Sequence, residues 1–445
     1  MKIKFALIFI GFIASAALTS ALSNQELIGA KEIAKNTQYR TVEPTEMPLA
    51  RMQNTLDLSR PLTTWARVYD EANPEYELMN SIQQTSDGGY IIAGSTWFEG
   101  LYPDFLLIKT DGNGNKQWEK TFDRGKDIDD ATSVRQTSAG KYIATGRTYT
   151  DLKGFQVWLI KTDENGNKVW ANTFGGMHED YGESVQQLAD AYGSYIVAGH
   201  TKSFRGGIWD IYLIKTDTDG NLQWETNIGG SRWDTATSIL PTSDGGYIVL
   251  GDTESYGAGG SDLWLLKIDS NGNRLWDKTF GEEGNDYSHS IEKTSDGGYI
   301  ISGDTVALND RGREIGGTPW LIKTDSNGNK EWDRTYEGRY GTYAQQTRDG
   351  GYIIATSTSS IPSTKQDLLL IKTDASGNQQ WHVTIGGPED ENAYSVRQTI
   401  DGGYIIAGNT ASCGSGRSKI LVVKTDAEGR VHAEPDCESI SIQEY

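Results

Sequence analysis

The stretch Ser81–Phe122 reads SIQQTSDGGYIIAGSTWFEGLYPDFLLIKTDGNGNKQWEKTF, and it recurs in slightly altered form to the end of the chain. One tyrosine marks each copy, and successive tyrosines are separated by 52, 53, 52, 52, 53 and 52 residues: Tyr90, Tyr142, Tyr195, Tyr247, Tyr299, Tyr352 and Tyr404. A fixed spacing of this size is the sequence signature of a repeat architecture. Most of the 445-residue chain therefore consists of seven copies of one structural unit.

Each copy contains four short strand signals. In the first copy they are Ser81–Thr85, the apolar runs Tyr90–Gly94 and Phe105–Ile108, and a segment that carries Trp118. Turns rich in Gly, Asn and Asp separate these segments, and none of the segments shows a sustained helical period. A tandem unit of four strands predicts an all-β fold, a seven-bladed β-propeller with four-stranded antiparallel blades.

The two ends of the repeat region are complementary. Residues 62–69 (LTTWARVY) hold a tryptophan strand without the three strands that precede it elsewhere, whereas the last copy has Ala433 and Pro435 at the end where its tryptophan strand would run. Proline cannot donate to a sheet ladder. We therefore predict that the Trp65 strand completes the last blade and closes the ring. The tryptophans of this strand, which we expect to pack between blades, are Trp65, Trp118, Trp170, Trp224, Trp276, Trp332 and Trp381.

The sequence divides the chain into four parts. Residues 1–23 combine two lysines, an apolar run and small residues, which is the pattern of a secretory signal peptide. Residues 24–61 lack the repeat and are expected to form a leader or linker, partly disordered and partly helical around 26–35. The propeller is expected to span 62–429, followed by a C-terminal tail, 430–445. The protein is expected to be secreted, extracellular or periplasmic, with no transmembrane segment.

The charge of the chain limits its partners. The formal net charge is −20, so Coulomb repulsion disfavours nucleic acid and anionic membrane surfaces. Cations, basic proteins and neutral glycans remain open. We expect an extracellular glycan or protein as the partner, and we expect the protein itself to be a monomer.

The chain has two cysteines. Cys413 lies between the second and third strands of the last copy, and Cys437 lies in the tail. If the tail turns at Gly429 and runs back along the blade, both cysteines reach one face. In an exported protein a disulfide between them is expected, with a stabilising effect of roughly 3 kcal/mol. The alternative is a pair of unpaired thiols.

The connections within each copy differ in length. Those between the first and second strands and between the third and fourth strands are tight hairpins, whereas the other two are long, irregular and expected on one common face, the long-loop face. Binding residues are commonly carried on loops held by a rigid scaffold. We therefore expect a ligand on this face, where three tryptophans outside the repeat are candidates for stacking on a sugar or a partner side chain: Trp97, Trp209 and Trp233.

Acidic residues stand four positions before the expected innermost strand in six copies: Glu77, Asp129, Asp180, Asp234, Asp286 and Glu391. The remaining copy has Arg339. One interpretation is a ring of carboxylates at the mouth of the central channel that binds a cation or a basic ligand. The other is structural: each carboxylate accepts backbone N–H bonds within its own loop. The pattern favours the structural interpretation, and the six residues remain candidates for ligand binding.

No catalytic residues are predicted. The five histidines fall in different copies without metal-ligand spacing and are expected on the surface or in loops: His178, His200, His289, His382 and His432. Turns such as Asp111–Asn115 resemble calcium loops but lack the bidentate glutamate, and a tight turn needs these residue types for its own conformation. We expect no cofactor, with calcium as the alternative left open.

Two motifs carry a family resemblance. The chain resembles the propeller repeats of exported bacterial and archaeal proteins through Asp-Gly-Gly-Tyr-Ile-Ile-Ala-Gly at 87–94 and 401–408, and through Lys-Thr-Asp-x-x-Gly-Asn-x-x-Trp at 109–118, 161–170 and 323–332. The resemblance covers residues 63–429 and implies the fold. The turn-to-tryptophan part is also similar to the docking motif of quinoprotein-type propellers, the pyrroloquinoline-quinone dehydrogenases. This chain differs from them in repeat number and lacks an adjacent cysteine pair and an alanine opening the motif, so only the architecture is implied.

These observations predict a secreted, non-catalytic binding or interaction module that uses the long-loop face. The alternative is a glycan-cleaving enzyme, similar to glycoside hydrolases, with carboxylates near the channel mouth. A quinone- or metal-dependent oxidoreductase is a third class. A carboxylate pair in a deep, aromatic-lined cleft would favour the hydrolase, whereas a shallow face would favour binding.

Overall fold

The protein is described from a computed structural model. It describes residues 64–69, 76–97, 102–125, 128–190, 193–204, 208–308, 314–359, 365–413, 417–432 and 435–444. The chain separates into two units, Met1–Arg60 and Pro61–Tyr445. The expected signal peptide (1–23) and leader (24–61) lie outside the described residues, so the fold is that of the second unit. Within the described residues, no helix is long and apolar enough to span a bilayer.

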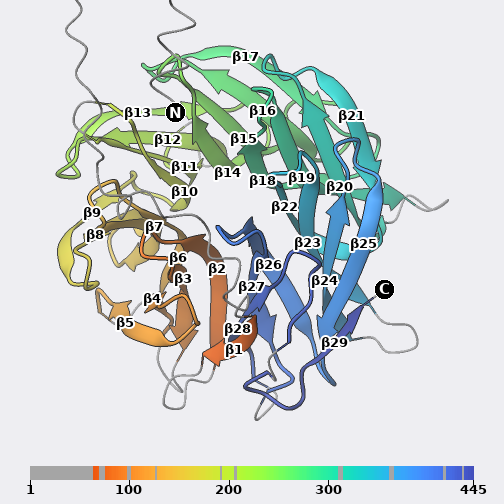
Figure 1. Ribbon diagram of the computed structural model, residues 1–445. Coiled ribbons are helices and arrows are strands. Elements are labelled where there is room, and N and C mark those ends of the chain that lie inside the picture. Colours follow the sequence, from red (N-terminus) through yellow and green to blue (C-terminus); the bar gives the residue numbers. More distant parts are fainter. Residues whose placement is uncertain are drawn as a thin grey trace, which may run out of the picture. The chain divides into compact units, whose positions relative to one another are not determined.

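The second unit is a seven-bladed β-propeller, as predicted (Figure 1). The first strand of each blade lies nearest the centre of the ring: β2 (Tyr76–Gln84), β6 (Asp129–Gln136), β10 (Asp180–Gln187), β14 (Asp234–Pro241), β18 (Asp286–Lys293), β22 (Arg339–Gln346) and β26 (Glu391–Gln398). These strands are longer than the sequence predicts. The innermost strand of blade 1 begins at Tyr76 instead of Ser81, so the acidic positions belong to the strands themselves.

The second and third strands of each blade form the core. The second strands are β3 (Tyr90–Trp97), β7 (Tyr142–Thr150), β11 (Tyr195–Thr201), β15 (Tyr247–Thr253), β19 (Tyr299–Leu308), β23 (Tyr352–Ser359) and β27 (Tyr404–Thr410). The third strands are β4 (Asp104–Thr110), β8 (Gly154–Thr162), β12 (Asp210–Thr216), β16 (Asp262–Ile268), β20 (Glu314–Thr324), β24 (Gln366–Thr373) and β28 (Lys419–Thr425). Ile91 packs toward blade 2 and Ile92 toward blade 7. Both faces of these strands are therefore buried between neighbouring sheets, as their continuous apolar runs predict.

The outermost strands carry the repeat tryptophans. They are β5 (Lys116–Phe122), β9 (Lys168–Phe174), β13 (Leu222–Ile228), β17 (Arg274–Phe280), β21 (Lys330–Thr335), β25 (Gln379–Gly386) and β1 (Trp65–Tyr69). Trp118 of blade 1 meets Tyr142 of blade 2 edge-on, with ring centroids 5.6 Å apart. Its ring also covers Gly166 of blade 2, where a Cβ would lie 2.8 Å from the indole. The indole N–H donates to the carbonyl of Glu164 in the same turn at 3.3 Å. The tryptophans therefore pack between blades, as predicted.

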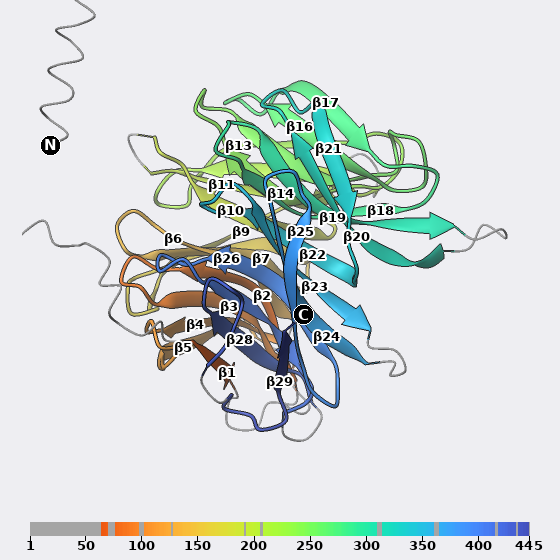
Figure 2. The same cartoon turned by 45° about the vertical axis from the view of Figure 1, so that its right-hand side comes forward.

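The N-terminal strand closes the ring. β1 pairs antiparallel with β28, with Trp65 opposite Lys424, and both views place β1 at the edge of the sheet that contains β26 to β28 (Figures 1 and 2). Trp65 then packs on blade 1, where its ring centroid lies 5.9 Å from that of Tyr90. The Tyr69 hydroxyl donates to the carbonyl of Gly114 in blade 1 at 2.7 Å. One short strand thus completes the last blade and joins it to the first.

Glutamines at the ends of the innermost strands join blades on the hairpin-turn face, the face formed by the first-to-second and third-to-fourth connections. The Ser86 N–H of blade 1 donates to Gln136 Oε1 of blade 2 at 2.8 Å. The Ser138 N–H of blade 2 donates to Gln187 Oε1 of blade 3 at 2.7 Å. The same contact is made at three further junctions, including that between blades 7 and 1, by Gln346, Gln398 and Gln84.

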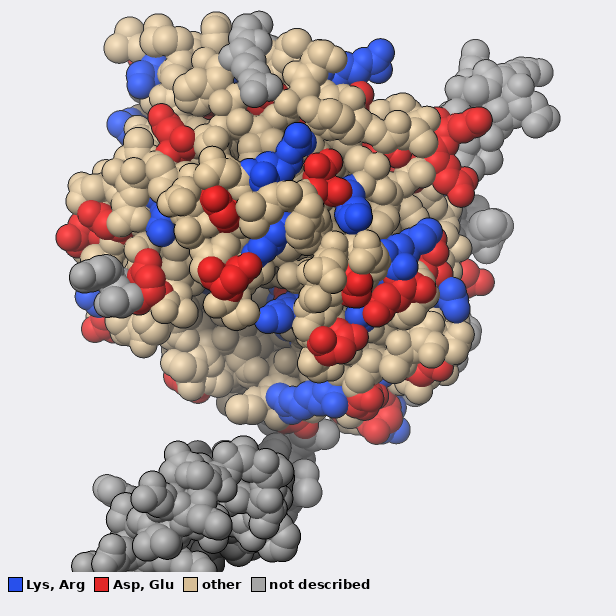
Figure 3. All heavy atoms as spheres, turned by 90° about the horizontal axis from the view of Figure 1, so that it is seen from above, with Lys and Arg blue, Asp and Glu red and all other residues tan. Residues whose placement is uncertain are grey.

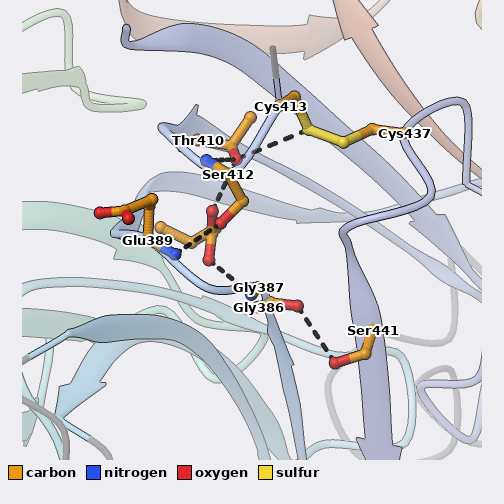
Figure 4. Close-up of a disulfide and its surroundings, with 9 residues drawn as sticks. Gly386, Gly387, Glu389, Thr410, Ser412, Cys413, Cys437 and Ser441 are labelled. Carbon is orange, nitrogen blue, oxygen red and sulfur yellow. Dashed lines mark hydrogen bonds between the residues drawn. A yellow bond between two sulfur atoms is a disulfide. The ribbon is translucent and has the colours of Figure 1, made fainter. Parts of the chain in front are cut away.

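The C-terminal tail contains a strand that the sequence did not predict. β29 (Ser441–Glu444) pairs with β25 and gives blade 6 a fifth strand. Cys413 and Cys437 form the predicted disulfide, with Cα atoms 5.9 Å apart (Figure 4). The Ser441 hydroxyl donates to the carbonyl of Gly386 at 3.2 Å. The tail thus runs from a blade 7 loop to the edge of blade 6, where it covers unpaired strand groups.

Candidate functional site

The long-loop face of blades 1 to 4 exposes large hydrophobic side chains. Among the described residues, eleven large hydrophobic side chains are exposed, and seven of them lie on this face: Tyr76, Tyr102, Tyr149, Leu152, Met177, Trp233 and Tyr256. Three others lie on outermost strands, namely Val169, Leu222 and Leu275, and Ile400 lies on the hairpin-turn face. Exposed apolar side chains that gather on one face make this face the candidate interaction surface.

The three predicted tryptophans occupy different settings. Trp233 is 58% exposed and offers an open ring. Trp97 is half-buried and meets the exposed Tyr76 edge-on at 5.9 Å. Trp209 is only 8% exposed, because it packs against Tyr181 and His200 with centroid distances of 4.9 and 4.7 Å. Trp209 therefore has little surface left for a ligand, and the structure does not bring the three rings into one cluster.

Trp233 and Tyr256 form the best-defined platform on the face. They lie on the two long connections of blade 4, which are joined by a bond of 2.8 Å from the Glu254 N–H to the Trp233 carbonyl. The Tyr256 ring rests on Trp264, with centroids 5.0 Å apart and planes tilted by 36°. Two further exposed rings are supported by edge-on contacts: Tyr76 by Trp97 and Tyr149 by Phe155. Supported rings lose little conformational entropy when a ligand binds.

Sequence reasoning missed the exposed tyrosines. Tyr76, Tyr102, Tyr149 and Tyr256 were not predicted as site residues, because tyrosine is also the core residue that marks each repeat. The feature that could have identified them is their position relative to the repeat. None of the four stands at the repeat position after the hairpin turn, where Tyr90 and its equivalents are buried.

A polar cavity of about 220 Å³ lies at the centre of the ring and is lined by side chains from all seven innermost strands. In six of these strands one residue is skipped in the pairing with the second strand, and that residue lines the cavity: Asn80, Thr132, Glu183, Thr237, His289 and Tyr394. A bulge bends a strand and re-aims a side chain. The repeated bulge thus places one polar side chain in the cavity from each of these blades.

The bulged residues fall into two groups. The first group bonds to the next blade: Asn80 Nδ2 donates to the Ala131 carbonyl at 2.7 Å and the Thr132 hydroxyl to the Gly182 carbonyl at 2.6 Å. Glu183 belongs to a second group without such a bond among the described residues. Titratable side chains surround Glu183, which lines the cavity and has 29% of its own side chain exposed.

Glu183 has a shifted pKa. Its Oε1 lies 3.9 Å from His200 Nδ1, while the nearby Arg147 is paired with Asp130 at 2.7 Å. Burial raises the pKa of Glu183 to about 7, although the Arg147 charge opposes the shift. Burial, with the charge of Arg147, lowers the pKa of His200 to about 3. At neutral pH a neutral imidazole, that of His200, therefore lies next to Glu183, a titrating carboxyl group that lines the cavity.

A second titratable pair faces the cavity from blade 5. His289 Nε2 lies 2.7 Å from Asp304 Oδ2, and the Thr342 hydroxyl donates to Asp304 Oδ1 at 2.7 Å. Burial alone would raise the pKa of Asp304, but the hydrogen bond and charge of His289 hold it below its usual value. His200 and His289 were expected on the surface or in loops, and this was wrong because both stand within strands. His200 lies in β11, and His289 is the bulged residue of β18.

The six predicted carboxylates are buried, and five of them accept a backbone N–H bond from the connection that precedes them: Asp129, Asp180, Asp234, Asp286 and Glu391. None of them lines the central cavity, and each is at most 1% exposed: Glu77, Asp129, Asp180, Asp234, Asp286 and Glu391. Asp234 shows the pattern, because its Oδ2 accepts the Gly230 N–H and the Ser255 hydroxyl, both at 2.7 Å. The Thr253 hydroxyl bonds to its other oxygen. Burial raises the pKa of Asp129 to about 6. These contacts match the structural interpretation, and ligand binding by the six residues stays a prediction.

The calcium-like turns use their own donors. Asp111 Oδ1 accepts the N–H groups of Asn113 and Asn115, both at 2.9 Å, and its Oδ2 accepts the Asn115 side chain at 2.9 Å. The Asp111 carboxylate thus serves the conformation of its own turn, and calcium binding stays a prediction. Among the described residues, no group of three or more His, Cys, Asp or Glu side chains could hold a metal ion.

The charges on the outside are mixed. The face of the unit seen in Figure 3 carries Lys and Arg interspersed with Asp and Glu, without a broad patch of one sign. This distribution gives no sign of a polyanion-binding surface on that side.

Comparisons with known proteins match the chain only at the level of solved structures. No protein-family model matches it, and no curated protein matches it. A Penicillium chrysogenum alpha-L-arabinanase complexed with arabinobiose is 11% identical over 82% of this chain and 98% of that one, with a TM-score of 0.47. Sqt1 from Chaetomium thermophilum is 10% identical over 86% and 90% of the two chains, with a TM-score of 0.46. The Fusarium graminearum alpha-L-arabinofuranosidase Arb93A, in complex with an iminosugar inhibitor, is 10% identical over 82% and 98%, with a TM-score of 0.47. These similarities do not assign an activity.

Proposed function

We propose that this protein is an exported binding module whose long-loop face, over blades 1 to 4, holds a neutral extracellular glycan. The observation that carries the proposal is the concentration of exposed aromatic rings on that face: Tyr76, Tyr102, Tyr149, Trp233 and Tyr256. Export follows from the signal peptide expected at residues 1–23.

The chemistry of the exposed rings supports a sugar ligand. An aromatic ring presents an apolar face on which the C–H groups of a sugar can stack, while a tyrosine hydroxyl or an indole N–H remains free for polar contacts. The rings are distributed over blades 1, 2 and 4, which suits an extended chain of sugar units better than a single apolar anchor. Trp233 and Tyr256, of which Tyr256 is braced by Trp264, form the main subsite.

Charge favours a neutral glycan over an acidic one. The chain carries a net charge of −20, and the acidic residues Glu179, Glu254 and Glu282 stand in the long connections beside the exposed rings. Repulsion would weaken the binding of uronic acids or sulfated sugars. Binding is preferred over cleavage because the six carboxylates that would flank a scissile bond are buried, and five of them accept backbone N–H bonds from their own connections.

The test is a glycan array followed by titration calorimetry on the best neutral hit. Trp233→Ala and Tyr256→Ala should each weaken binding about tenfold or more, because each removes an aromatic anchor. Leu275→Ala is the matched control, since Leu275 is 58% exposed but lies on an outermost strand. It should bind like the wild type.

Three outcomes would overturn the proposal. They are the absence of binding to any neutral glycan, equal losses in Leu275→Ala and Trp233→Ala, and release of reducing sugar from the bound glycan. Binding of a basic protein that Trp233→Ala abolishes would move the same surface to the protein-binding class.

A further inference from the structure

The central cavity carries a second feature that glycan binding on the loops does not use. In each blade one innermost-strand residue pairs with an isoleucine of the second strand, and together these residues form a layer around the channel: Gln83, Arg135, Gln186, Leu240, Glu292, Gln345 and Arg397. We call this set the arginine layer. Three of its positions are glutamine, so the two arginines are departures from the commonest residue of the layer.

The two arginines of the layer are held in the same way. Arg135 Nη1 donates to the Val134 carbonyl at 2.8 Å, and Arg397 Nη1 donates to the Val396 carbonyl at 2.9 Å. Each bond fixes one edge of a guanidinium group and leaves its other N–H groups directed away from the strand. Both side chains line the central cavity.

The acid–base pairing within the arginine layer is incomplete. Arg397 Nη2 pairs with Glu292 Oε1 at 2.9 Å. Among the described residues, Arg135 has no carboxylate within ion-pair distance, and its one hydrogen bond goes to the adjacent carbonyl of Val134. The layer thus holds two cations and one anion inside a chain whose net charge is −20. Burial and the charge of Arg397 lower the pKa of Arg135 to about 10, which leaves it charged at neutral pH.

The rest of the lining suits an oxyanion. The residues that line the cavity include the hydroxyl groups of Ser133, Ser395, Tyr343 and Tyr394, all of which can donate. A guanidinium group binds carboxylate or phosphate oxygens through two parallel N–H groups. Two carboxyl groups oppose an anion here. Glu292 pairs with Arg397, and its charge also acts on Arg135, so the two arginines together carry one positive charge more than Glu292 offsets. Glu183 lines the cavity, and burial raises its pKa to about 7, so a large fraction of it is neutral near pH 7.

We propose that the central channel is a binding site for a small oxyanion, a phosphate or a carboxylate, which Arg135 and Arg397 hold together. The cavity of about 220 Å³ has room for such an ion and a few waters but not for a sugar chain. The bound ion supplies the negative charge that Arg135 lacks and links blade 2 to blade 7. The site is independent of the glycan surface.

The test is thermal unfolding and titration calorimetry of the full-length mature protein with inorganic phosphate, sulfate and malonate, with chloride added to keep the ionic strength constant. We expect a saturable rise in the unfolding temperature of the wild type. Arg135→Gln places in blade 2 the residue that the layer has in three other blades, so it should fold, and it should bind the ion about ten- to a hundredfold more weakly.

Arg348→Gln is the matched control. Arg348 lies on the hairpin-turn face, donates to the Ile400 carbonyl and does not line the cavity. It should keep the full response.

A wild-type response that does not saturate, or an equal response in Arg135→Gln, would overturn the site. Strong responses to phosphate and sulfate without one to malonate would assign it to phosphate-type ions, and the reverse would assign it to carboxylates. Unchanged glycan binding by Arg135→Gln would show that the oxyanion site and the proposed glycan surface are independent, so that failure of one proposal would not imply failure of the other.

Discussion

The two faces of the ring are held together by different contacts. On the hairpin-turn face the contacts cross between blades: Trp118 covers Gly166 of the next blade, and Gln136 accepts the Ser86 N–H of the preceding one. On the long-loop face an acidic residue such as Asp234 braces the connections of its own blade. Backbone bonds also cross between blades on this face, such as that from the Asp234 N–H to the Trp209 carbonyl at 2.9 Å, but the packing of the repeat tryptophans between blades lies on the hairpin-turn side. The long loops can differ from blade to blade without opening the ring, and this is the side on which the aromatic rings are exposed.

The largest test of this comparison uses two tryptophans. Trp65 is 4% exposed and packs on blade 1, whereas Trp233 is 58% exposed on the long-loop face. Trp65→Ala should lower the free energy of unfolding by about 3–5 kcal/mol, because it removes a buried indole from the strand that closes the ring. Trp233→Ala should change it by less than about 0.5 kcal/mol. Urea unfolding followed by circular dichroism measures both.

The control for this pair is that both variants keep the wild-type far-ultraviolet spectrum before denaturant is added. Similar losses in the two variants would mean that the loop face is as important for ring integrity as the closing strand. The contrast between the two faces would then be wrong.

A smaller change in stability is expected when the contact between a repeat tryptophan and a turn glycine is disturbed. Gly114 and Gly88 both stand in turns of blade 1 with φ near +80°, at 77° and 83°. A Cβ on Gly114 would lie 2.8 Å from the Trp65 ring, while a Cβ on Gly88 would meet nothing within 4 Å. Both Gly→Ala variants pay about 1 kcal/mol for the left-handed backbone. Gly114→Ala should lose about 2 kcal/mol more, because the closing strand must shift.

Denaturation midpoints of the two alanine variants give this difference directly, since the backbone cost cancels. If Gly88→Ala is as unstable as Gly114→Ala, contact with Trp65 contributes nothing beyond the backbone conformation. Rescue of Gly114→Ala by Trp65→Leu would instead identify the clash as the cause.

The fold could be predicted because the repeat is a long-range constraint. A constant spacing fixes the number of blades, and an orphan tryptophan strand at Trp65 facing an empty position near Ala433 fixes the closure. The pairing of Cys413 with Cys437 then follows from the compartment. In each case the inference uses the order of elements along the chain, which does not depend on side-chain geometry.

The candidate sites could not be predicted in the same way. A bulge shifts one residue in a strand and leaves no trace in the alternation of apolar and polar residues, so Glu183 and His289 gave no sign that they line the channel. Trp209 stands in a long connection but is buried by Tyr181, a contact between separate elements. The four-residue strand β29 is too short to have a periodic pattern. The missed features all depend on packing between segments.

The smallest expected effect concerns two residues of the central channel. Thr132 and Glu183 occupy the same bulge position in adjacent blades. Thr132 bonds to the next blade and does not titrate, whereas burial raises the pKa of Glu183 from 4.5 to about 7. A pKa raised on folding means that the stability from the neutral carboxyl is complete below about pH 4.5 and is lost as the pH rises through 7.

Glu183→Gln should therefore gain roughly 1–2 kcal/mol over the wild type between pH 5 and pH 8, after allowance for screening by water in the channel. Thr132→Val should lose a similar amount at both pH values, because its lost hydrogen bond does not involve a proton equilibrium. Urea unfolding at the two pH values measures these differences. A pH-independent effect of Glu183→Gln would mean that ionisation of Glu183 does not contribute to the stability of the ring.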